Sequence, residues 1–158
     1  MKADSILETI GNTPHIRLSR MFPDHEVWVK SERANPGGSI KDRIALTMIE
    51  AAEAEGRIKP GDMLIEATAG NTGLGLALVA AQKGYRLTIV MPDKMAQEKV
   101  FHLKALGAEV IMTRSDVERG HPAYYQDMAE KLAKETPGSF WINQFANPNN
   151  PLSHQTTT

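Results

Sequence analysis

The sequence predicts an α/β fold with three layers: an open, mostly parallel sheet covered by helices on both faces. Short apolar, β-branched runs of strand length recur along the chain, and a segment of helical length follows each of them. Turn-forming glycines and prolines separate these elements. Strands that alternate with helices form βαβ units and parallel sheets, which bind ligands beyond the carboxyl ends of their strands.

The elements follow in order along the chain. The first predicted strand, residues 26–30, alternates apolar and polar side chains. The later strands have the apolar character of buried parallel strands, and we place them at 63–67, 86–91 and 109–113. The predicted helices span 39–56, 71–84, 95–107 and 122–136, and the first three end on glycine. The C-terminal segment, residues 143–158, is polar, and we expect it to be irregular, with no helix that covers the sheet.

Composition excludes several classes of protein. The 158 residues include 18 Lys+Arg, 19 Asp+Glu and no cysteine. A formal net charge of -1 gives no electrostatic reason to bind nucleic acid or an anionic membrane surface. The lack of cysteine excludes disulfides and thiolate nucleophiles, and it suits a reducing cytoplasm. No apolar run is long enough to span a membrane, and no histidine pair at i, i+4 indicates a metal site. We therefore expect a cytoplasmic enzyme or binding module without a metal.

The segment 35–43, NPGGSIKDR, places a lysine in the first turn of a helix. Ser39 and Asp42 have the spacing of a capping box, so we expect the helix to begin at Ser39. Apolar residues recur at helical spacing from Lys41, which puts it on the inward face. Burial and the positive end of the helix both favour a neutral amine, the form that attacks a carbonyl group. The alternative is a lysine whose stem packs and whose head reaches water. Asp42 and Arg43 are expected to be structural, as a helix cap and a surface ion-pair partner.

A glycine-rich turn follows the strand at 63–67. Backbone N–H groups at such a turn, where a helix begins, bind carboxylates or phosphates. Hydroxyl donors and an amide add to them. We interpret the turn as a ligand-binding loop made of Thr68, Ala69, Gly70, Asn71 and Thr72.

The same turn matches neither common nucleotide motif. The glycines at 70, 73 and 75 read G-x-x-G-x-G, whereas a dinucleotide site requires G-x-G-x-x-G, although Asp93 stands where a ribose-binding acid would. No G-K-[ST] follows, so the turn is not a P-loop. For Gly73 and Gly75 we favour close packing of the helix.

Together, NPGGSIKDR at 35–43 and EATAGNTG at 66–73 resemble the cysteine synthase/cystathionine β-synthase family, which are pyridoxal-phosphate enzymes of the tryptophan-synthase-β fold type (fold type II). Further matches are GNTP at 11–14, MP at 91–92, ALGAE at 105–109 and NQF at 143–145. The resemblance covers the whole chain but only the N-terminal half of a typical family core. It implies that residues 1–38 form an N-terminal segment that packs on an absent larger domain. Residues 39–142 would form a small α/β domain, and residues 143–158 would start the crossover to the larger domain.

The resemblance also implies a cofactor and roles for the matched residues. Lys41 would bind pyridoxal 5'-phosphate covalently as an aldimine and move the substrate α-proton. Asn71 would donate to the ring hydroxyl oxygen of the cofactor, and the loop at 68–72, assisted by Gln144, would bind the substrate α-carboxylate. Ala69 replaces the family's usual serine, so one hydroxyl contact is lost. No phosphate cradle follows Asn143, so we expect the chain alone to lack a complete cofactor site.

The activity implied by the resemblance is β-replacement on serine or O-acetylserine by a sulfur nucleophile. The product would be cysteine or cystathionine, in sulfur amino-acid biosynthesis, and the segment 91–100 looks slightly more like the cystathionine β-synthases. Expected partners are the amino acid, the sulfur nucleophile and a second copy in a homodimer. Alternatives are an inactive fragment or binding module, for example for a serine acetyltransferase tail, and a serine/threonine dehydratase-like enzyme.

Overall fold

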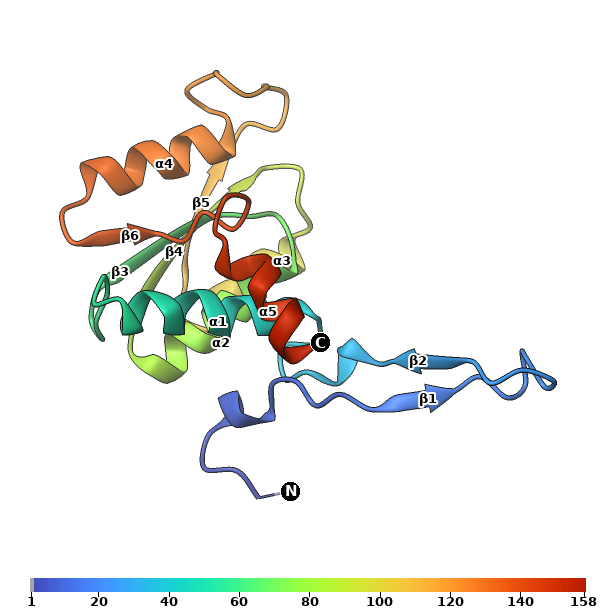
Figure 1. The fold of residues 1–158 in the computed structure, drawn as a ribbon. Helices are drawn as coiled ribbons and strands as arrows, with labels where there is room; N and C mark the ends of the chain where they lie inside the picture. The colour runs from blue at the N-terminus through green and yellow to red at the C-terminus, as the bar shows by residue number, and fades with distance from the viewer. Residues whose placement is uncertain (1) are drawn as a thin grey trace.

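The computed structural model describes residues 2–158 and confirms the α/β architecture (Figure 1). Four strands form a parallel sheet in the order β5–β4–β3–β6. Their bounds are β3 Met63–Ala67, β4 Arg86–Pro92, β5 Glu109–Thr113 and β6 Ser139–Trp141. The strands predicted at 63–67, 86–91 and 109–113 are therefore present, whereas the strand predicted at 26–30 lies outside this sheet, and β6 is an addition that the sequence analysis did not expect.

Helices cover both faces of the sheet, as predicted. α4 (Tyr125–Glu135) packs alone on one face, against β3, β4 and β6. The other face carries α1 (Lys41–Ala54), α2 (Asn71–Lys83) and α3 (Gln97–Ala105), and α1 packs along α2. Alternate strand residues supply two separate cores: Leu64 and Ile89 face α1 and α2, whereas Ile65 and Val90 face α4.

The start of α1 differs from the predicted capping box. The helix begins at Lys41, two residues later than expected. Ile40, and not Ser39, is the N-cap residue, although the Oγ of Ser39 accepts from the N–H of Lys41 at 3.1 Å. The Asp42 carboxylate does not accept from the backbone N–H of Ser39, as a capping box requires. It accepts from the N–H of Gly37 at 2.5 Å instead. Asp42 therefore holds the glycine turn ahead of the helix, and burial raises the pKa of this carboxyl group.

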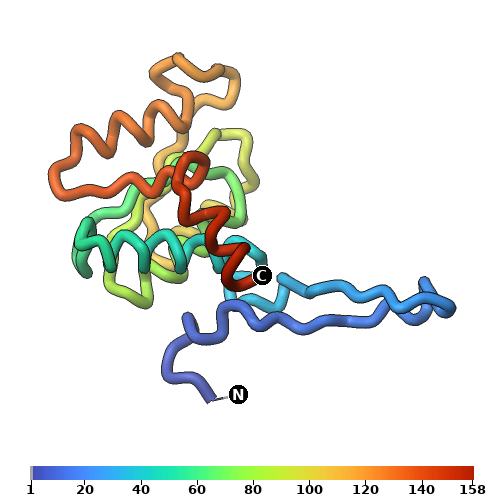
Figure 2. Tube along the Cα trace, viewed as in Figure 1, coloured from blue at the N-terminus to red at the C-terminus, as the bar shows by residue number. Residues whose placement is uncertain are grey.

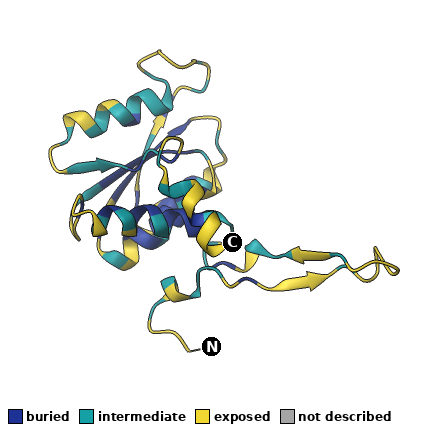
Figure 3. Ribbon diagram, viewed as in Figure 1, coloured by how far each residue is buried: buried dark blue, intermediate teal, exposed yellow. Residues whose placement is uncertain are grey.

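The N-terminal part forms an arm that projects from the sheet domain (Figures 1 and 2). It contains two short helical turns and an antiparallel hairpin: η1 Ile6–Thr9, β1 His15–Arg17, β2 Trp28–Lys30 and η2 Glu32–Ala34. Most residues of this hairpin are exposed (Figure 3), and the apolar Ile16 and Trp28 are 51% and 50% exposed. The arm therefore presents an apolar surface that the rest of the described chain does not cover.

The expectation of an irregular C-terminal segment is wrong. Asn149–Thr157 forms α5, which packs against α1. Side-chain bonds fix the turn that precedes this helix: Asn147 Oδ1 accepts from the N–H of Asn149 at 3.0 Å, and Asn150 Nδ2 donates to the carbonyl of Gln144 at 2.8 Å. Tertiary packing thus stabilises a helix that its polar sequence does not favour.

Candidate active site

The structure brings the first turns of α1 and α2 close together. Gly75 lies in α2, and a Cβ atom there would be 3.0 Å from the carbonyl oxygen of Lys41 and 3.2 Å from Cβ of Ala45. A glycine is therefore needed for this approach, which agrees with the packing role expected for Gly75. Lys41 begins α1 and Asn71 begins α2, so the predicted lysine and the predicted asparagine both start helices that meet at Gly75.

Lys41 is only half-buried, although the next four residues of α1 are buried. Its backbone N–H is held by Ser39. Within residues 2–158 its Nζ takes part in no hydrogen bond or ion pair. The amine is thus placed on a fixed helix turn without an internal partner, as a nucleophile or a carbonyl-binding group requires.

Arg43 is not at the surface, contrary to the sequence-based expectation. It is 2% exposed and forms a bidentate ion pair with Glu32, Nε to Oε2 at 2.7 Å and Nη2 to Oε1 at 2.9 Å. Its Nη1 also donates to the carbonyl of Thr157 at the end of α5. Arg43 holds the pKa of the Glu32 carboxyl at about 2. The guanidinium therefore joins η2, α1 and α5 just behind the Lys41 turn.

Two segments that carry the resemblance meet at the same place. Asn35 Oδ1 accepts from the N–H of Gly11 at 2.8 Å, and Asn35 Nδ2 donates to Glu32 Oε2 at 2.9 Å. Thr13 Oγ1 donates to Glu32 Oε1 at 2.5 Å. The GNTP segment at 11–14 and the NPGG turn are thus tied into one hydrogen-bonded unit before α1.

The predicted ligand-binding loop lies between β3 and α2, at the carboxyl end of the sheet. Thr68 and Thr72 are buried, whereas Gly70 and Asn71 are exposed. Thr68 Oγ1 accepts from the N–H of Gly70 at 3.2 Å and so stabilises the turn. Within residues 2–158, the N–H groups of Asn71 and Thr72 have no acceptor. They are the unsatisfied donors of a helix N-terminus and suit a carboxylate or phosphate.

Gln144 joins this loop from the segment that follows β6, the strand next to β3. Thr72 Oγ1 donates to Gln144 Oε1 at 2.7 Å. The hydroxyl proton of Thr72 is therefore bound by Gln144 within the protein, so its use by a ligand requires Gln144 to move, and the role of Thr72 as a ligand donor stays a prediction. The structure thus groups the predicted loop with Gln144, which stands 72 residues from Thr72.

Glu66 is a site residue that the sequence analysis missed. It lies at 0% exposure in β3, and its two carboxylate oxygens accept from the backbone N–H and side-chain Nε2 of Gln144 at 3.2 and 3.3 Å. Burial raises the pKa of Glu66 to about 7. A single acid within the apolar strand MLIEA is the sequence signal that points to it, since buried acids need partners.

Lys99 is a second addition. Its Nζ donates to the carbonyl of Ala69 at 3.3 Å, which connects α3 to the ligand-binding loop. The ammonium group thus stands against the backbone of the loop and adds positive charge beside the free N–H groups of α2.

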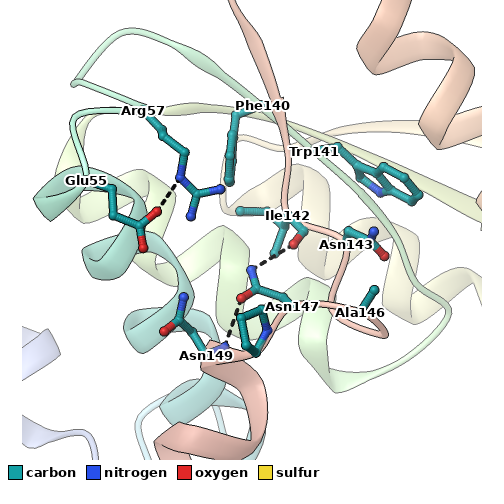
Figure 4. Close-up of a pocket in the computed structure, with 10 residues that line it drawn as sticks. Glu55, Arg57, Phe140, Trp141, Ile142, Asn143, Ala146, Asn147 and Asn149 are labelled. Atoms are coloured by element: carbon teal, nitrogen blue, oxygen red, sulfur yellow. Dashed lines mark hydrogen bonds and ion pairs between the residues drawn. The ribbon is translucent and has the colours of Figure 1, made fainter.

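A cavity of about 460 Å³ opens between the end of α1 and the β6–α5 connection (Figure 4). Arg57 forms an ion pair with Glu55 at 2.6 Å, and its guanidinium carbon lies 4.9 Å from the ring centre of Phe140. Asn147 Nδ2 closes one wall by donating to the carbonyl of Ile142 at 3.0 Å. None of the predicted site residues lines this cavity, so it is separate from the loop and the lysine.

Across residues 2–158, no cluster of three or more His, Cys, Asp or Glu has the arrangement of a metal site. In the same part of the chain, no helix has both the length and the apolar character needed to cross a membrane.

Comparisons with known proteins agree with this geometry. A family model described as "Pyridoxal-phosphate dependent enzyme" matches residues 6–158. The chain is 52% identical over 153 residues to cysteine synthase B of Escherichia coli (strain K12), covering 96% of this chain and 49% of that protein. It is 51% identical over 153 residues to cystathionine beta-synthase of Dictyostelium discoideum, covering 96% of this chain and 31% of that protein.

A solved structure, that of an O-ureido-L-serine synthase, superposes with a TM-score of 0.92 at 43% identity. The superposition covers 99% of this chain and 49% of the other. The chain therefore spans about half the length of the cysteine synthase and of the solved structure, and about a third of the cystathionine beta-synthase.

Proposed function

Because the chain belongs to the family of pyridoxal-phosphate-dependent enzymes, we propose that it carries the lysine and the carboxylate-binding loop of a β-replacement enzyme. The substrate is serine or O-acetylserine, and a sulfur nucleophile takes the place of its β-substituent. The single observation that carries the proposal is the pairing of two features. An unpartnered Lys41 amine starts α1, and a loop with free N–H groups starts α2, which packs directly on α1.

The residues present fit such a cofactor and substrate. Lys41 offers a primary amine for covalent attachment of the cofactor carbonyl carbon. A side chain at Gly75 would push α1 and α2 apart by a few tenths of an ångström, so this glycine lets the two helix starts lie close together. Pyridoxal phosphate, when bound, supplies an electron sink for the carbanion at Cα of the amino acid.

Each residue of the site has a chemical task in the proposed reaction. Lys41 would accept the α-proton of the amino acid and later return a proton. The N–H groups of Asn71 and Thr72 hold the α-carboxylate, and the exposed Asn71 amide donates to the cofactor ring oxygen. Ala69 contributes only backbone, so this loop has one hydroxyl fewer than a serine would supply.

The relatives support serine-type substrates without separating the acceptors. Their names include a cysteine synthase and a cystathionine beta-synthase at almost equal identity, 52% and 51%. Sulfide and homocysteine are therefore the two acceptors to compare directly. We extend the proposal to a cytoplasmic homodimer, with serine acetyltransferase as a candidate protein partner.

We also propose that residues 1–38 pack on a further domain, and that the small domain spans 39–142, with 143–158 leading onward. The exposed apolar side chains of the hairpin support this division, because Ile16 and Trp28 are half exposed and Met21 is 71% exposed. Apolar surface of this kind normally marks an interface.

Borohydride reduction of the cofactor-loaded protein, co-expressed with a family C-terminal half that supplies the missing phosphate cradle, tests the proposal. The reduced cofactor should be found by peptide mass analysis on Lys41, and Lys41→Ala should remove both the label and the visible absorbance. Lys30 is an internal control, since its Nζ already donates to the carbonyl of Thr13 at 3.2 Å and should stay unlabelled. A label on Lys30, or a visible spectrum that survives Lys41→Ala, would show that the assignment is wrong.

A further inference from the structure

Glu66 and Gln144 form a buried contact beside the ligand-binding loop. Glu66 is 0% exposed and Gln144 is 8% exposed. Gln144 Nε2 donates to Glu66 Oε1 at 3.3 Å and to the carbonyl of Ala67 at 3.4 Å, and its backbone N–H donates to Glu66 Oε2 at 3.2 Å. The hydrogen bonds to this carboxyl group come from β3 itself and from residues 143–144.

These contacts fix the direction of the Gln144 amide. If the amide were turned over, its oxygen would face two acceptors, the carboxylate of Glu66 and the carbonyl of Ala67, and a buried amide would lose its hydrogen bonds. With the amide as it stands, Oε1 accepts the hydroxyl proton of Thr72 at 2.7 Å. Both amide donors are thus directed at Glu66 and Ala67, and none is directed at the loop.

The two donor bonds of Gln144 Nε2 are long, at 3.3 and 3.4 Å. They lie beyond the usual range of 2.7–3.2 Å for N–H···O bonds, whereas the Thr72 bond is short and well formed. The amide donors of Gln144 are therefore held weakly, and a second carboxylate near Thr72 would offer them a charged acceptor.

We propose that Glu66 is a positioning residue that sets the affinity of the loop for a substrate carboxylate, because it competes with that carboxylate for the amide donors of Gln144. The inference rests on the proposed function, which assigns the α-carboxylate to residues 68–72 and Gln144. Without ligand, the Glu66 carboxyl group accepts the hydrogen bond from Gln144 Nε2 that the substrate carboxylate accepts when it is bound. When a ligand binds, Gln144 turns from Glu66 toward the loop and releases the hydroxyl proton of Thr72 for the ligand.

The variant Glu66→Gln tests this competition. An amide oxygen at this position is a neutral acceptor and holds Gln144 less strongly than a carboxylate does. The probe is L-alanine, which has the α-carboxylate and α-amino group of the substrate and no β-substituent to replace. Calorimetric titration of the same cofactor-loaded complex at about pH 8.5, where the Glu66 carboxyl group is mostly ionised, should give a Kd roughly five-fold lower for Glu66→Gln than for the wild type, a change that corresponds to about 1 kcal/mol.

A matched control distinguishes this effect from a general effect of removing a carboxylate. Glu53 in α1 is a partly buried acid that accepts from Tyr85 and from Lys83, both at 2.8 Å, on the opposite side of the sheet domain from the loop. Glu53→Gln should leave the Kd of L-alanine unchanged. A purely structural role for Glu66 predicts the opposite of the proposal, since a disturbed strand would weaken binding.

The NMR signals of the Gln144 side-chain amide give a readout that does not depend on activity. In the wild type they should shift when L-alanine is added, and in ligand-free Glu66→Gln they should already be shifted, with a new contact to the Thr72 methyl group. The wild-type titration stays informative even if Glu66→Gln does not fold, because an amide that does not respond to L-alanine would overturn the proposal.

The outcomes separate the inference from the function on which it rests. If the wild type does not bind L-alanine, the proposed function fails. If the wild type binds it and Glu66→Gln binds it equally or more weakly, the loop assignment stands and the role of Glu66 is overturned. Tighter binding by Glu66→Gln together with a shifted Gln144 amide supports the competition.

Discussion

Glu32→Gln is the substitution whose effect on stability the structure defines most sharply. Glu32 accepts two hydrogen bonds from the guanidinium of Arg43, which is 1% exposed in its side chain, while the carboxylate is 16% exposed. A glutamine keeps the shape and one acceptor oxygen but leaves a buried guanidinium without its counter-charge. The variant should therefore lose stability at neutral pH by an amount set by the pairing of these two groups.

The pKa of Glu32 supplies the magnitude. It is lowered from 4.5 to about 2, chiefly by the hydrogen bonds from Arg43. At about 1.36 kcal/mol per pKa unit, the partners of this carboxylate, Arg43 foremost and then Thr13 and Asn35, together contribute roughly 3 kcal/mol to the free energy of unfolding at pH 7. This agrees with the roughly 3–5 kcal/mol that is lost when one partner of a buried ion pair is removed.

The sign of the pH dependence follows from the lowered pKa. The folded protein binds the Glu32 proton less readily than the unfolded chain, so the stabilisation is fully present above the unfolded pKa of 4.5. It is lost as the pH falls from there toward about 2. The difference between wild type and Glu32→Gln should therefore be largest at neutral pH and should shrink steadily below pH 4.5.

Urea denaturation, followed by circular dichroism from pH 7 down to pH 3, measures this difference. Asp116→Asn is the control, because Asp116 pairs with Arg114 at 2.7 Å but both side chains are largely exposed. The control should unfold like the wild type at every pH. A wild-type-minus-Glu32→Gln difference that is below about 1 kcal/mol at pH 7, or that does not change with pH, would refute the reasoning.

Four further predictions concern the site. Gly75→Ala should destabilise the fold by about 1–3 kcal/mol in urea denaturation, because the added methyl group meets helix backbone at 3.0 Å, whereas Gly70→Ala meets open space and should cost less. Asn71→Ala should weaken cofactor affinity roughly 10- to 100-fold in a fluorescence titration, the loss expected for a hydrogen bond to a charged oxygen, and an unchanged affinity would remove it from the site. Thr68→Ala should raise the KM for the amino acid while absorbance shows the cofactor still bound; loss of cofactor with an unchanged KM would contradict the loop assignment. Burial raises the pKa of Glu66 to about 7, so the free energy of unfolding should fall by up to about 3 kcal/mol as the pH rises from 4.5 to 7, and Glu66→Gln should remove this slope.

The sheet was predictable because its signals are local. The strand at 109–113 has the bounds expected from its apolar run, and the strand at 63–67 does as well. α2 ends where Gly84 adopts a positive φ of 76°, as its glycine predicts. Patterns of this kind depend on neighbouring residues, which the sequence displays directly.

The elements that escaped prediction depend on distant partners. β6 has three residues and exists because it pairs with β3, and α5 is a polar helix that forms against α1. Arg43 has the sequence context of a surface residue, and it is buried because η2 and α5 both contact its guanidinium group. No local pattern reports such contacts, because packing decides them.

The site was predictable in its residue types and not in its hydrogen-bond directions. Turn chemistry indicates the glycine-rich loop, whereas spacing left two roles open for the lysine and the family resemblance chose between them. The use of the Thr72 hydroxyl by Gln144, and the acid behind it, became visible only when residues 66 and 144 were brought together. The roles of Lys41, Asn71 and Gln144 in binding stay predictions until the labelling and titration experiments are done.

The position of β6 beside β3 also governs how the chain assembles during synthesis. Met63 pairs with Ser139, so one edge of β3 stays unpaired until residues 139–141 have left the ribosome. At about 5–20 residues per second, the ribosome needs on the order of several seconds to supply that partner strand. During this interval the nascent chain holds β3 paired on one side only, with β4, and offers an open ladder of N–H and C=O groups to any other extended chain. Chaperone capture or slow refolding at high concentration should therefore affect this protein most before β6 has docked.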